Sequence, residues 1–207
     1  MQTTQKEFPC FAAALLAGGA SFRMRRDKAM IPVQFNNTQM ALWQRQWIVL
    51  ARMKPAQMMI SGPRKDAYPT SIHIIPDRWP GIGPVSGLGT CLEWMTAPFL
   101  LVLAVDLAQI SEACLRALLH QVTSGCGVIP AQHGRYEPLA AIYPKKSLHI
   151  VAEFLKRDGR RLQRLSQLLV ESKLVKCWPI PPELSSDFNN WNRPEDIRIQ
   201  SRQIDEA

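Results

Sequence analysis

The sequence lacks a long hydrophobic run and a recognisable leader segment, and each absence bears on where the protein works. No apolar segment approaches the roughly 20 residues that are needed to span a bilayer. The first ten residues, MQTTQKEFPC, do not show the charged-then-apolar pattern of a signal peptide. We therefore expect a cytoplasmic protein that has no membrane partner.

Cysteine is scarce and irregularly spaced. The five cysteines stand at positions 10, 91, 114, 126 and 177, so their number is odd and no two form a C-x-x-C pair. This spacing argues against a zinc site and against a disulfide framework. We expect reduced and mostly buried thiols, because a free cysteine packs as a small hydrophobic residue.

Acidic residues are fewer than basic ones, with 17 Asp and Glu against 25 Lys and Arg and a net charge of +8. This excess favours an anionic partner, such as nucleic acid, a phosphorylated metabolite or a membrane surface. The basic residues are dispersed, and they do not alternate with aromatic residues as in RNA-binding segments. We therefore do not expect a nucleic acid partner.

Short apolar runs alternate along the chain with longer segments of helical periodicity. We expect helices at residues 40–53, 87–95, 111–122, 148–156 and 162–169, and a last helix that opens at Pro194. We expect strands at residues 11–17, 57–61, 72–75, 99–105, 126–130, 139–143 and 174–178. This alternation predicts an α/β fold with a mostly parallel sheet between two helical layers, whose ligands bind at the carboxyl ends of the strands.

The stretch LLAGGASFRMRRDKAMIPV, residues 15–33, joins an apolar run to a glycine pair and then to a cationic segment. Gly18 and Gly19 allow backbone N–H groups to approach an anion, and Arg23 and Lys28 carry charge that neutralises phosphate. The alternative is a plain turn followed by a solvated basic face. The stretch contains neither a Walker motif nor a G-x-G-x-x-G fingerprint.

Asp106 directly follows FLLVLAV, the most apolar of the expected strands. A carboxylate at this place either caps the following turn or holds Mg²⁺, which takes one or two carboxylates together with phosphate oxygens. We favour the metal ligand, because the glycine loop is expected at the same edge of the sheet. Two segments that are distant in the sequence would then meet at one site.

These stretches resemble the molybdenum cofactor guanylyltransferases, a family of molybdopterin nucleotidyltransferases. The glycine-rich stretch is similar to the family signature L-A-G-G-x-S-x-R-M-G-x-D-K. Further similarities follow in the family's order: LWQRQ (42–46), IIPDRWPGIGPVSGL (74–88), FLLVLAVDLAQIS (99–111), EPLAAIY (137–143), FLKRDGRRL (154–162) and FNNWNRPEDI (188–197). The resemblance predicts a nucleotidyltransferase domain at 11–198, after an N-terminal extension at 1–10 and before a C-terminal tail at 199–207.

The resemblance implies a Rossmann-like three-layer α/β/α sandwich with a mixed, mostly parallel sheet of seven or eight strands. It implies transfer of GMP from Mg-GTP to the terminal phosphate of molybdopterin, with release of pyrophosphate. Mg²⁺ is the implied cofactor. GTP and the molybdenum cofactor are the implied partners, and molybdoenzymes or their chaperones are further candidates, while the oligomeric state stays open.

The resemblance also assigns nucleotide-binding positions. Leu16, Ala17 and Gly18 would lie along the nucleotide, together with Gly19 of the same loop. Asp77 would help to hold the nucleotide.

The expected catalytic residues are Arg23, Lys28 and Asp106. By the resemblance, Lys28 would contact phosphates and Asp106 would bind Mg²⁺. Charge considerations add Arg23, which with Lys28 would offset charge that builds on the departing pyrophosphate. Asn190 and Asn192 would lie near the metal and the substrate.

The chain departs from the family pattern at four places. An asparagine that follows the second strand in the family falls near Ser61 or Pro63 here. Arg25 replaces a glycine, Arg193 replaces a threonine, and the P-C-D-M-P turn has become AVDLA at 104–108, without the rigidity of proline. These changes leave two alternatives open: a transferase that uses CTP or another phosphorylated acceptor, and a non-catalytic descendant that binds nucleotide or cofactor. The turn at 83–88 resembles the guanylyl type and favours GTP over CTP.

Overall fold

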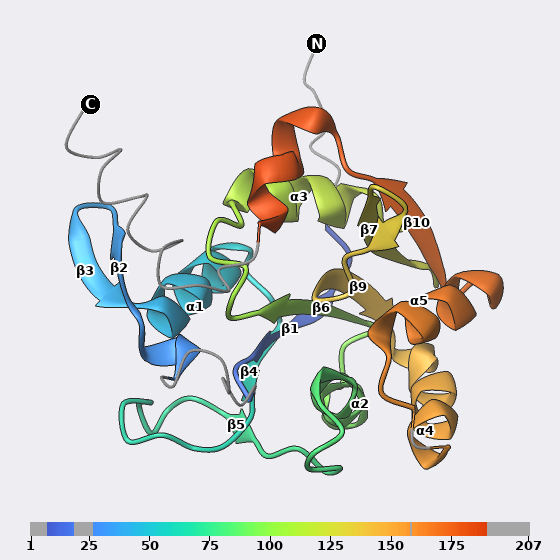
Figure 1. Ribbon diagram of the computed structural model, residues 1–207, viewed down its shortest axis with the longest axis horizontal. Coiled ribbons are helices and arrows are strands. Elements are labelled where there is room, and N and C mark those ends of the chain that lie inside the picture. The colour runs from blue at the N-terminus through green and yellow to red at the C-terminus, as the bar shows by residue number, and fades with distance from the viewer. Residues whose placement is uncertain (1–7, 19–26, 158, 190–207) are drawn as a thin grey trace.

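The computed structural model describes residues 8–18, 27–157 and 159–189 (Figure 1). Its centre is an eight-stranded sheet in the order β10-β7-β9-β6-β1-β4-β5, with β8 paired to β7. The strands of this sheet are β1 (Phe11–Leu16), β4 (Gln57–Ser61), β5 (Ile74–Ile75), β6 (Phe99–Ala104), β7 (Gly127–Gln132), β8 (Arg135–Tyr136), β9 (Ala140–Pro144) and β10 (Val175–Pro179).

Most neighbouring strands of the sheet are parallel. β1 lies between β6 and β4 and is parallel to both, β5 is parallel to β4, and β10 is parallel to β7. β9 runs antiparallel to β6 and β7, and β8 runs antiparallel to β7. The predicted α/β fold with a mostly parallel, mixed sheet of seven or eight strands is therefore confirmed.

Helices cover both faces of the sheet, which gives three layers (Figure 1). One face carries α1 (Leu42–Arg52) and α3 (Glu112–His120), and the other carries α2 (Pro84–Trp94), α4 (Leu148–Lys156) and α5 (Leu162–Glu171). Short 3₁₀ helices complete the description: η1 (Lys28–Met30), η2 (Lys145–Ser147) and η3 (Pro182–Phe188).

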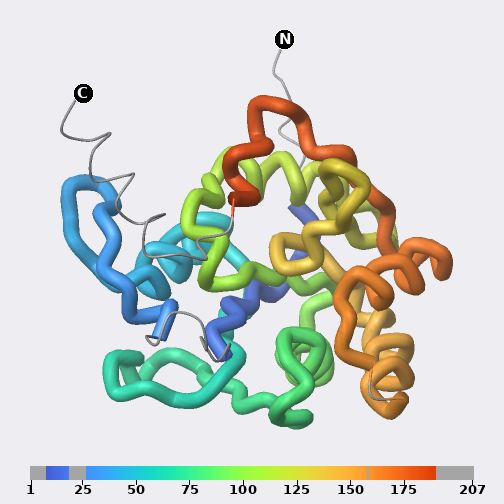
Figure 2. The backbone as a smooth tube through the Cα atoms, viewed as in Figure 1, coloured from blue at the N-terminus to red at the C-terminus, as the bar shows by residue number. Residues whose placement is uncertain are grey.

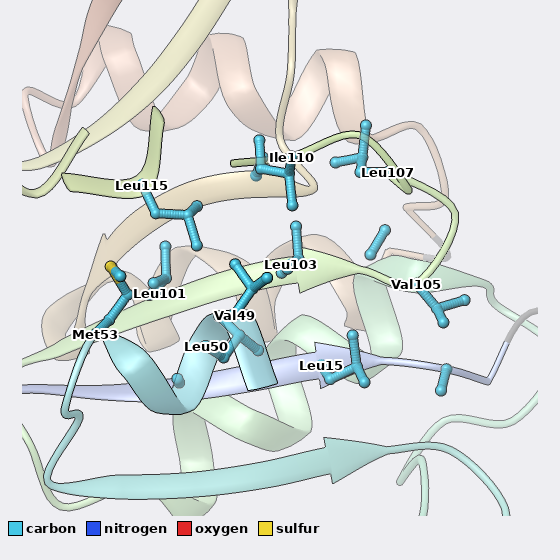
Figure 3. Close-up of a cluster of buried hydrophobic side chains, with 14 of the residues drawn as sticks. Leu15, Val49, Leu50, Met53, Leu101, Leu103, Val105, Leu107, Ile110 and Leu115 are labelled. Atoms are coloured by element: carbon cyan, nitrogen blue, oxygen red, sulfur yellow. The ribbon is translucent and has the colours of Figure 1, made fainter. Parts of the chain in front are cut away.

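Two hydrophobic cores lie on the two faces of the central strands. Leu15, Leu101 and Leu103 pack with Val49 and Leu50 of α1, as Figure 3 shows, whereas their neighbours in the strands pack toward α2, α4 and α5. Successive side chains of a strand point to opposite faces. A strand buried on both faces therefore reads as a continuous apolar run, as residues 99–104 do.

A hairpin that the sequence analysis did not predict precedes α1. β2 (Pro32–Phe35) and β3 (Thr38–Ala41) pair antiparallel, and the hairpin extends from the body of the molecule in Figure 2. Asn36 and Asn37 form its two-residue turn with φ of 48° and 60°, values that asparagine tolerates well. The helix expected at 40–53 therefore begins only at Leu42.

Other expectations are confirmed or corrected residue by residue. The strand at 57–61 and the helix at 148–156 have the expected bounds, but the strand expected at 72–75 is reduced to Ile74–Ile75. The expectation of mostly buried thiols is wrong: all five are free, but only Cys91 and Cys114 are buried. Cys177 is exposed in β10, which is the edge strand of the sheet.

Some expectations concern parts of the chain that the structure does not describe. The last helix, which was expected to open at Pro194, lies outside the described residues. Within the described ranges, no helix has both the length and the apolar character needed to cross a bilayer.

The core makes a direct prediction about stability. Leu103 is fully buried in β6, so Leu103→Ala leaves a cavity and is expected to lower the free energy of unfolding by about 2–5 kcal/mol. Chemical denaturation measures the change. The control Ser124→Ala, in an exposed turn, is expected to stay within about 0.5 kcal/mol. An equally small change in Leu103→Ala would contradict the packing described here.

Candidate active site

Lys28 and Asp106 meet at the carboxyl-end edge of the sheet. The Nζ of Lys28 lies 3.0 Å from Oδ2 of Asp106, although 78 positions separate the two residues. The side chains are 20% and 26% exposed, so a ligand from solvent is able to reach both. Partly exposed ion pairs typically add only about 0–1 kcal/mol to stability. The fold therefore does not depend on this pair, and the expected meeting of the two segments is confirmed.

Lys28 is positioned by the short helix that it begins. Asp27 caps η1 by accepting a hydrogen bond from Ala29 N at 3.0 Å. Ala29 and Ile31 are buried in the core on the α1 face, which fixes the backbone on either side of the turn. Lys28 thus projects from an anchored segment toward the end of β6.

Asp106 lies in the turn between β6 and α3. Val105 N donates to Leu16 O at 3.1 Å, which joins this turn to the end of β1. The alternative that Asp106 caps a helix is not supported for α3, because Ser111 is the N-cap and its Oγ accepts from Cys114 N. The carboxylate of Asp106 instead contacts Lys28.

Close backbone contact brings the glycine loop to the end of β4. A Cβ on Gly62 would lie 2.8 Å from the Cα of Gly18, and Gly62 has a φ of 137°, so a side chain is excluded there on both grounds. Ala17 N donates to Ser61 O at 2.9 Å. The exposed backbone after β1 is therefore held against the segment that follows β4.

Asp77 faces the same glycine loop. Its Oδ1 accepts a hydrogen bond from Ser61 Oγ at 2.8 Å, and its Oδ2 would be 3.6 Å from a Cβ placed on Gly18. The structure therefore brings together Ala17, Gly18 and Asp77, three of the residues predicted to bind nucleotide. Leu16 is buried and packs in the hydrophobic core on the α2 face of the sheet.

The first turns of α2 close this side of the site. Gly83 has a φ of 91° and precedes Pro84 at the first position of the helix. Gly87 approaches the sheet so closely that a Cβ would lie 2.6 Å from Ser61 Oγ. The N-terminal end of α2, which carries the positive end of the helix dipole, therefore lies beside Ser61 and Asp77.

The donor set fits a magnesium ion that is shared with a substrate. Among residues 8–18, 27–157 and 159–189, no cluster of three or more His, Cys, Asp or Glu is arranged to hold a metal. Mg²⁺ does not need such a cluster, since it is commonly bound by one or two carboxylates plus phosphate oxygens and water. Asp106 is suited to supply such a carboxylate.

One further charged group at the site was not recognised from the sequence. Lys65 Nζ lies 2.6 Å from Oδ2 of Asp27 and 3.5 Å from Ala17 O, and its side chain is only 16% exposed. Its position depends on tertiary contacts between loops, for which the sequence carries no periodic signal. Gly19 and Arg23, both predicted site residues, lie outside the described residues, as do Arg25 and the two asparagines at 190 and 192.

Solved structures share this fold. A nucleotidyl transferase from Methanothermobacter superposes with a TM-score of 0.74 at 12% identity, covering 96% of this chain and 99% of the other. The molybdopterin-guanine dinucleotide biosynthesis protein A from Archaeoglobus fulgidus gives 0.69 at 20% identity, covering 95% and 100%. The fold is therefore that of the nucleotidyltransferases.

Sequence comparison places the chain within this class. The family model described as the MobA-like NTP transferase domain matches residues 13–173. A protein of Opitutus terrae, named probable molybdenum cofactor guanylyltransferase, is 33% identical over 190 residues, covering 89% of this chain and 92% of the other. A protein of Halalkalibacterium halodurans with the same name is 29% identical over 195 residues, covering 88% and 93%. The chain belongs to the MobA-like nucleotidyltransferase family.

The close approach of α2 to Asp77 makes a prediction about binding. Gly87→Ala would push Ser61 Oγ away from Asp77 and is expected to weaken nucleoside triphosphate binding about tenfold, the cost of one hydrogen bond to a charged group. Isothermal titration calorimetry measures the dissociation constant. Gly89→Ala is the matched control, because its Cβ would instead meet side chains of α4 and Trp79. Equal affinities of the two variants would contradict the role of this contact.

Proposed function

We propose that the protein transfers GMP from Mg-GTP to molybdopterin and releases pyrophosphate, which yields the guanine dinucleotide form of the molybdenum cofactor. The observation that carries the proposal is the Lys28–Asp106 pair beside the glycine loop, at the carboxyl ends of β1 and β6. The names of the relatives from Opitutus and Halalkalibacterium support the choice of substrates.

Nucleotidyl transfer requires positioning of the substrates and neutralisation of their charge, and it needs no nucleophile from the protein. An oxygen of the terminal phosphate of molybdopterin attacks the α-phosphorus of GTP in line. A new P–O bond forms while the bond to the β-phosphate oxygen breaks, and pyrophosphate leaves with the electron pair. The attacking oxygen is already anionic, so no general base is needed, in keeping with the exposed position of all four histidines.

Each predicted site residue named below has a part in this proposal. The backbone at Ala17 and Gly18 lies along the nucleotide, and Asp77, held by Ser61, contacts it from the side of β5. Lys28, together with Arg23, offsets the charge that develops on the departing pyrophosphate. Asp106 holds Mg²⁺, which when bound polarises the phosphate oxygens that it contacts.

We assign the Lys28–Asp106 ion pair to the state of the site without substrate. Lys28 and Asp106 neutralise each other at 3.0 Å, so neither charge is left without a counterion. With the nucleotide and its metal bound, Asp106 would hold the cation and Lys28 would contact a phosphate oxygen, so each would exchange its partner for a charge of the ligand. The exchange conserves charge pairing, and the small stability contribution of the pair keeps its cost low.

Two alternatives from the sequence remain as competing proposals. A transferase specific for CTP or for another phosphorylated acceptor needs the same phosphate site, so only the base and acceptor contacts would differ. A non-catalytic carrier would not need Lys28, Asp77 and Asp106 to be kept at one edge of the sheet, and their convergence favours an enzyme. Three further points stay predictions: the domain bounds at 11–198, the cytoplasmic location, and molybdoenzymes or their chaperones as partners.

Removing either member of the pair is expected to abolish nearly all transfer. Lys28→Ala and Asp106→Ala should each lower the rate of pyrophosphate release roughly hundredfold or more, because a fixed charge is lost from the reacting centre. The assay uses Mg-GTP with molybdopterin, and circular dichroism verifies folding.

A second ion pair provides the control for these variants. Arg52 of α1 and Glu112 of α3 lie 2.6 Å apart and have no part in the proposed reaction, so alanine at either position should leave turnover unchanged. Turnover like that of the unmodified protein in Lys28→Ala or Asp106→Ala would remove the proposed roles.

The choice of nucleotide is tested separately. We expect GTP with Mg²⁺ to raise the melting temperature more than CTP with Mg²⁺, because a ligand stabilises the folded state in proportion to its affinity. Pyrophosphate release from CTP but not from GTP would support a transferase that is specific for CTP. Release from neither nucleotide, with binding retained, would support the carrier.

A further inference from the structure

The turn that carries Asp106 is held by two side chains of α1. Gln46 is fully buried, and its Nε2 donates to Leu107 O at 2.7 Å and lies 3.5 Å from Ala104 O. These two carbonyls belong to residues on either side of Asp106. The amide of Gln46 therefore contacts the backbone both before and after the carboxylate.

Arg45 fixes the orientation of this amide. Its Nη1 donates to Gln46 Oε1, and its Nη2 donates to Ile110 O at 2.8 Å. Burial lowers the pKa of Arg45 to about 10, an effect that the charge of Asp187 opposes, so the guanidinium stays protonated at neutral pH. Because Gln46 Oε1 accepts from Arg45, Gln46 Nε2 is left facing the carbonyls of the turn.

The far end of the turn is held by Asp187. Ser111 N donates to Asp187 Oδ2 at 2.9 Å, and Ser111 Oγ donates to the same oxygen. Leu107 and Ile110 are buried within the core on the α1 face, and Figure 3 shows both side chains in the turn that follows β6. Asp106 is thus a partly exposed residue between buried Val105 and Leu107.

The composition of the turn explains why such support matters. Residues 104–108 read AVDLA, and none of these residues restricts φ as proline does. A carboxylate on an unrestrained turn loses the fixed position that gives a metal ligand its effect. Side chains that hydrogen-bond the turn supply the missing restraint through tertiary contacts.

We propose that Gln46, oriented by Arg45, is a positioning residue that sets the backbone of the Asp106 turn for magnesium binding. The inference rests on the proposed function, in which Asp106 holds Mg²⁺. It assigns the LWQRQ segment a part in catalysis through contacts with the turn, although neither side chain has to touch the nucleotide.

The test compares Gln46→Met with Val49→Ala. Methionine keeps the length of the side chain and suits a helix, but it cannot donate to Leu107 O. Val49 lies one turn further along α1, is buried, and packs in the core without a hydrogen bond to the turn, so its truncation reports a general loss of stability. The two variants separate positioning from packing.

The first readout is the dependence on magnesium. Gln46→Met should need about 10- to 100-fold more Mg²⁺ for half of the rise in melting temperature that GTP produces, the usual effect of removing a group that orients a metal ligand. At a Mg²⁺ concentration that just saturates the unmodified protein, kcat should fall with little change in the KM for GTP, and added Mg²⁺ should partly restore it. Val49→Ala should lower the melting temperature but keep the magnesium dependence of the unmodified protein.

The second readout needs no ligand. Hydrogen exchange of the amides of residues 104–110 should be faster in Gln46→Met than in Val49→Ala, because only the former releases the turn. Equal exchange together with equal magnesium dependence in the two variants would overturn the inference. If Gln46→Met does not fold, Arg45→Lys decides by the same two readouts, because lysine cannot bond both Gln46 and Ile110 through a rigid fork.

The outcomes also separate this inference from the proposed function. If the unmodified protein releases no pyrophosphate from GTP with molybdopterin, the proposed reaction is wrong. Faster exchange and a higher Mg²⁺ requirement in Gln46→Met would then still support the positioning role of Gln46.

Discussion

The register of β1 between two parallel neighbours is the constraint on which the site depends. Leu16, the last residue of β1, lies opposite Ala104 of β6 and opposite Ser61 of β4. Three chain segments therefore leave the sheet at one edge and at one level. A shift of one residue would turn every side chain of β1 to the other face, so the buried apolar pattern on both faces fixes this register.

The register of β1 also determines which charged groups meet at the site. The three segments that leave the sheet contribute different groups: exposed backbone at Gly18, the carboxylate of Asp106, and the hydroxyl of Ser61, which donates to Asp77 from the segment after β5. Lys28 adds a cation from η1, and Lys65 pairs with the cap of that helix. Cations and carboxylates thus alternate across the site. Such an arrangement is stable without a ligand and is matched to a ligand that brings phosphate and metal together.

Much of this arrangement was predictable from the sequence. The continuous apolar run at 99–104 identifies a strand buried on both faces, and parallel strands bring their carboxyl ends together, so the meeting of the glycine loop with Asp106 followed from pattern and topology. The helix expected at 111–122 is present as α3, with Ser111 as its N-cap and Glu112 in its first turn. These features are local or periodic, and sequence carries such signals well.

Other features were missed for physical reasons. The hairpin before α1 has a local signal, the Asn36-Asn37 turn, but its strands are short and Thr38–Ala41 continues into the helical pattern of α1. The interactions of Gln46 and Lys65 are tertiary, and nothing in their spacing shows which carbonyl or carboxylate they reach. The exposure of Cys177 depends on which strand lies at the edge of the sheet, and only the folded topology decides this.

The central claim is that the Lys28–Asp106 pair opens to receive a magnesium-bound triphosphate. The most direct test of this claim is a crystal structure of the protein with Mg²⁺ and a non-hydrolysable GTP analogue. The account predicts that the triphosphate lies against Ala17 and Gly18, with Asp106 on the metal and Lys28 moved to a phosphate oxygen. A nucleotide bound elsewhere on the surface, with Lys28 and Asp106 still 3.0 Å apart, would contradict it.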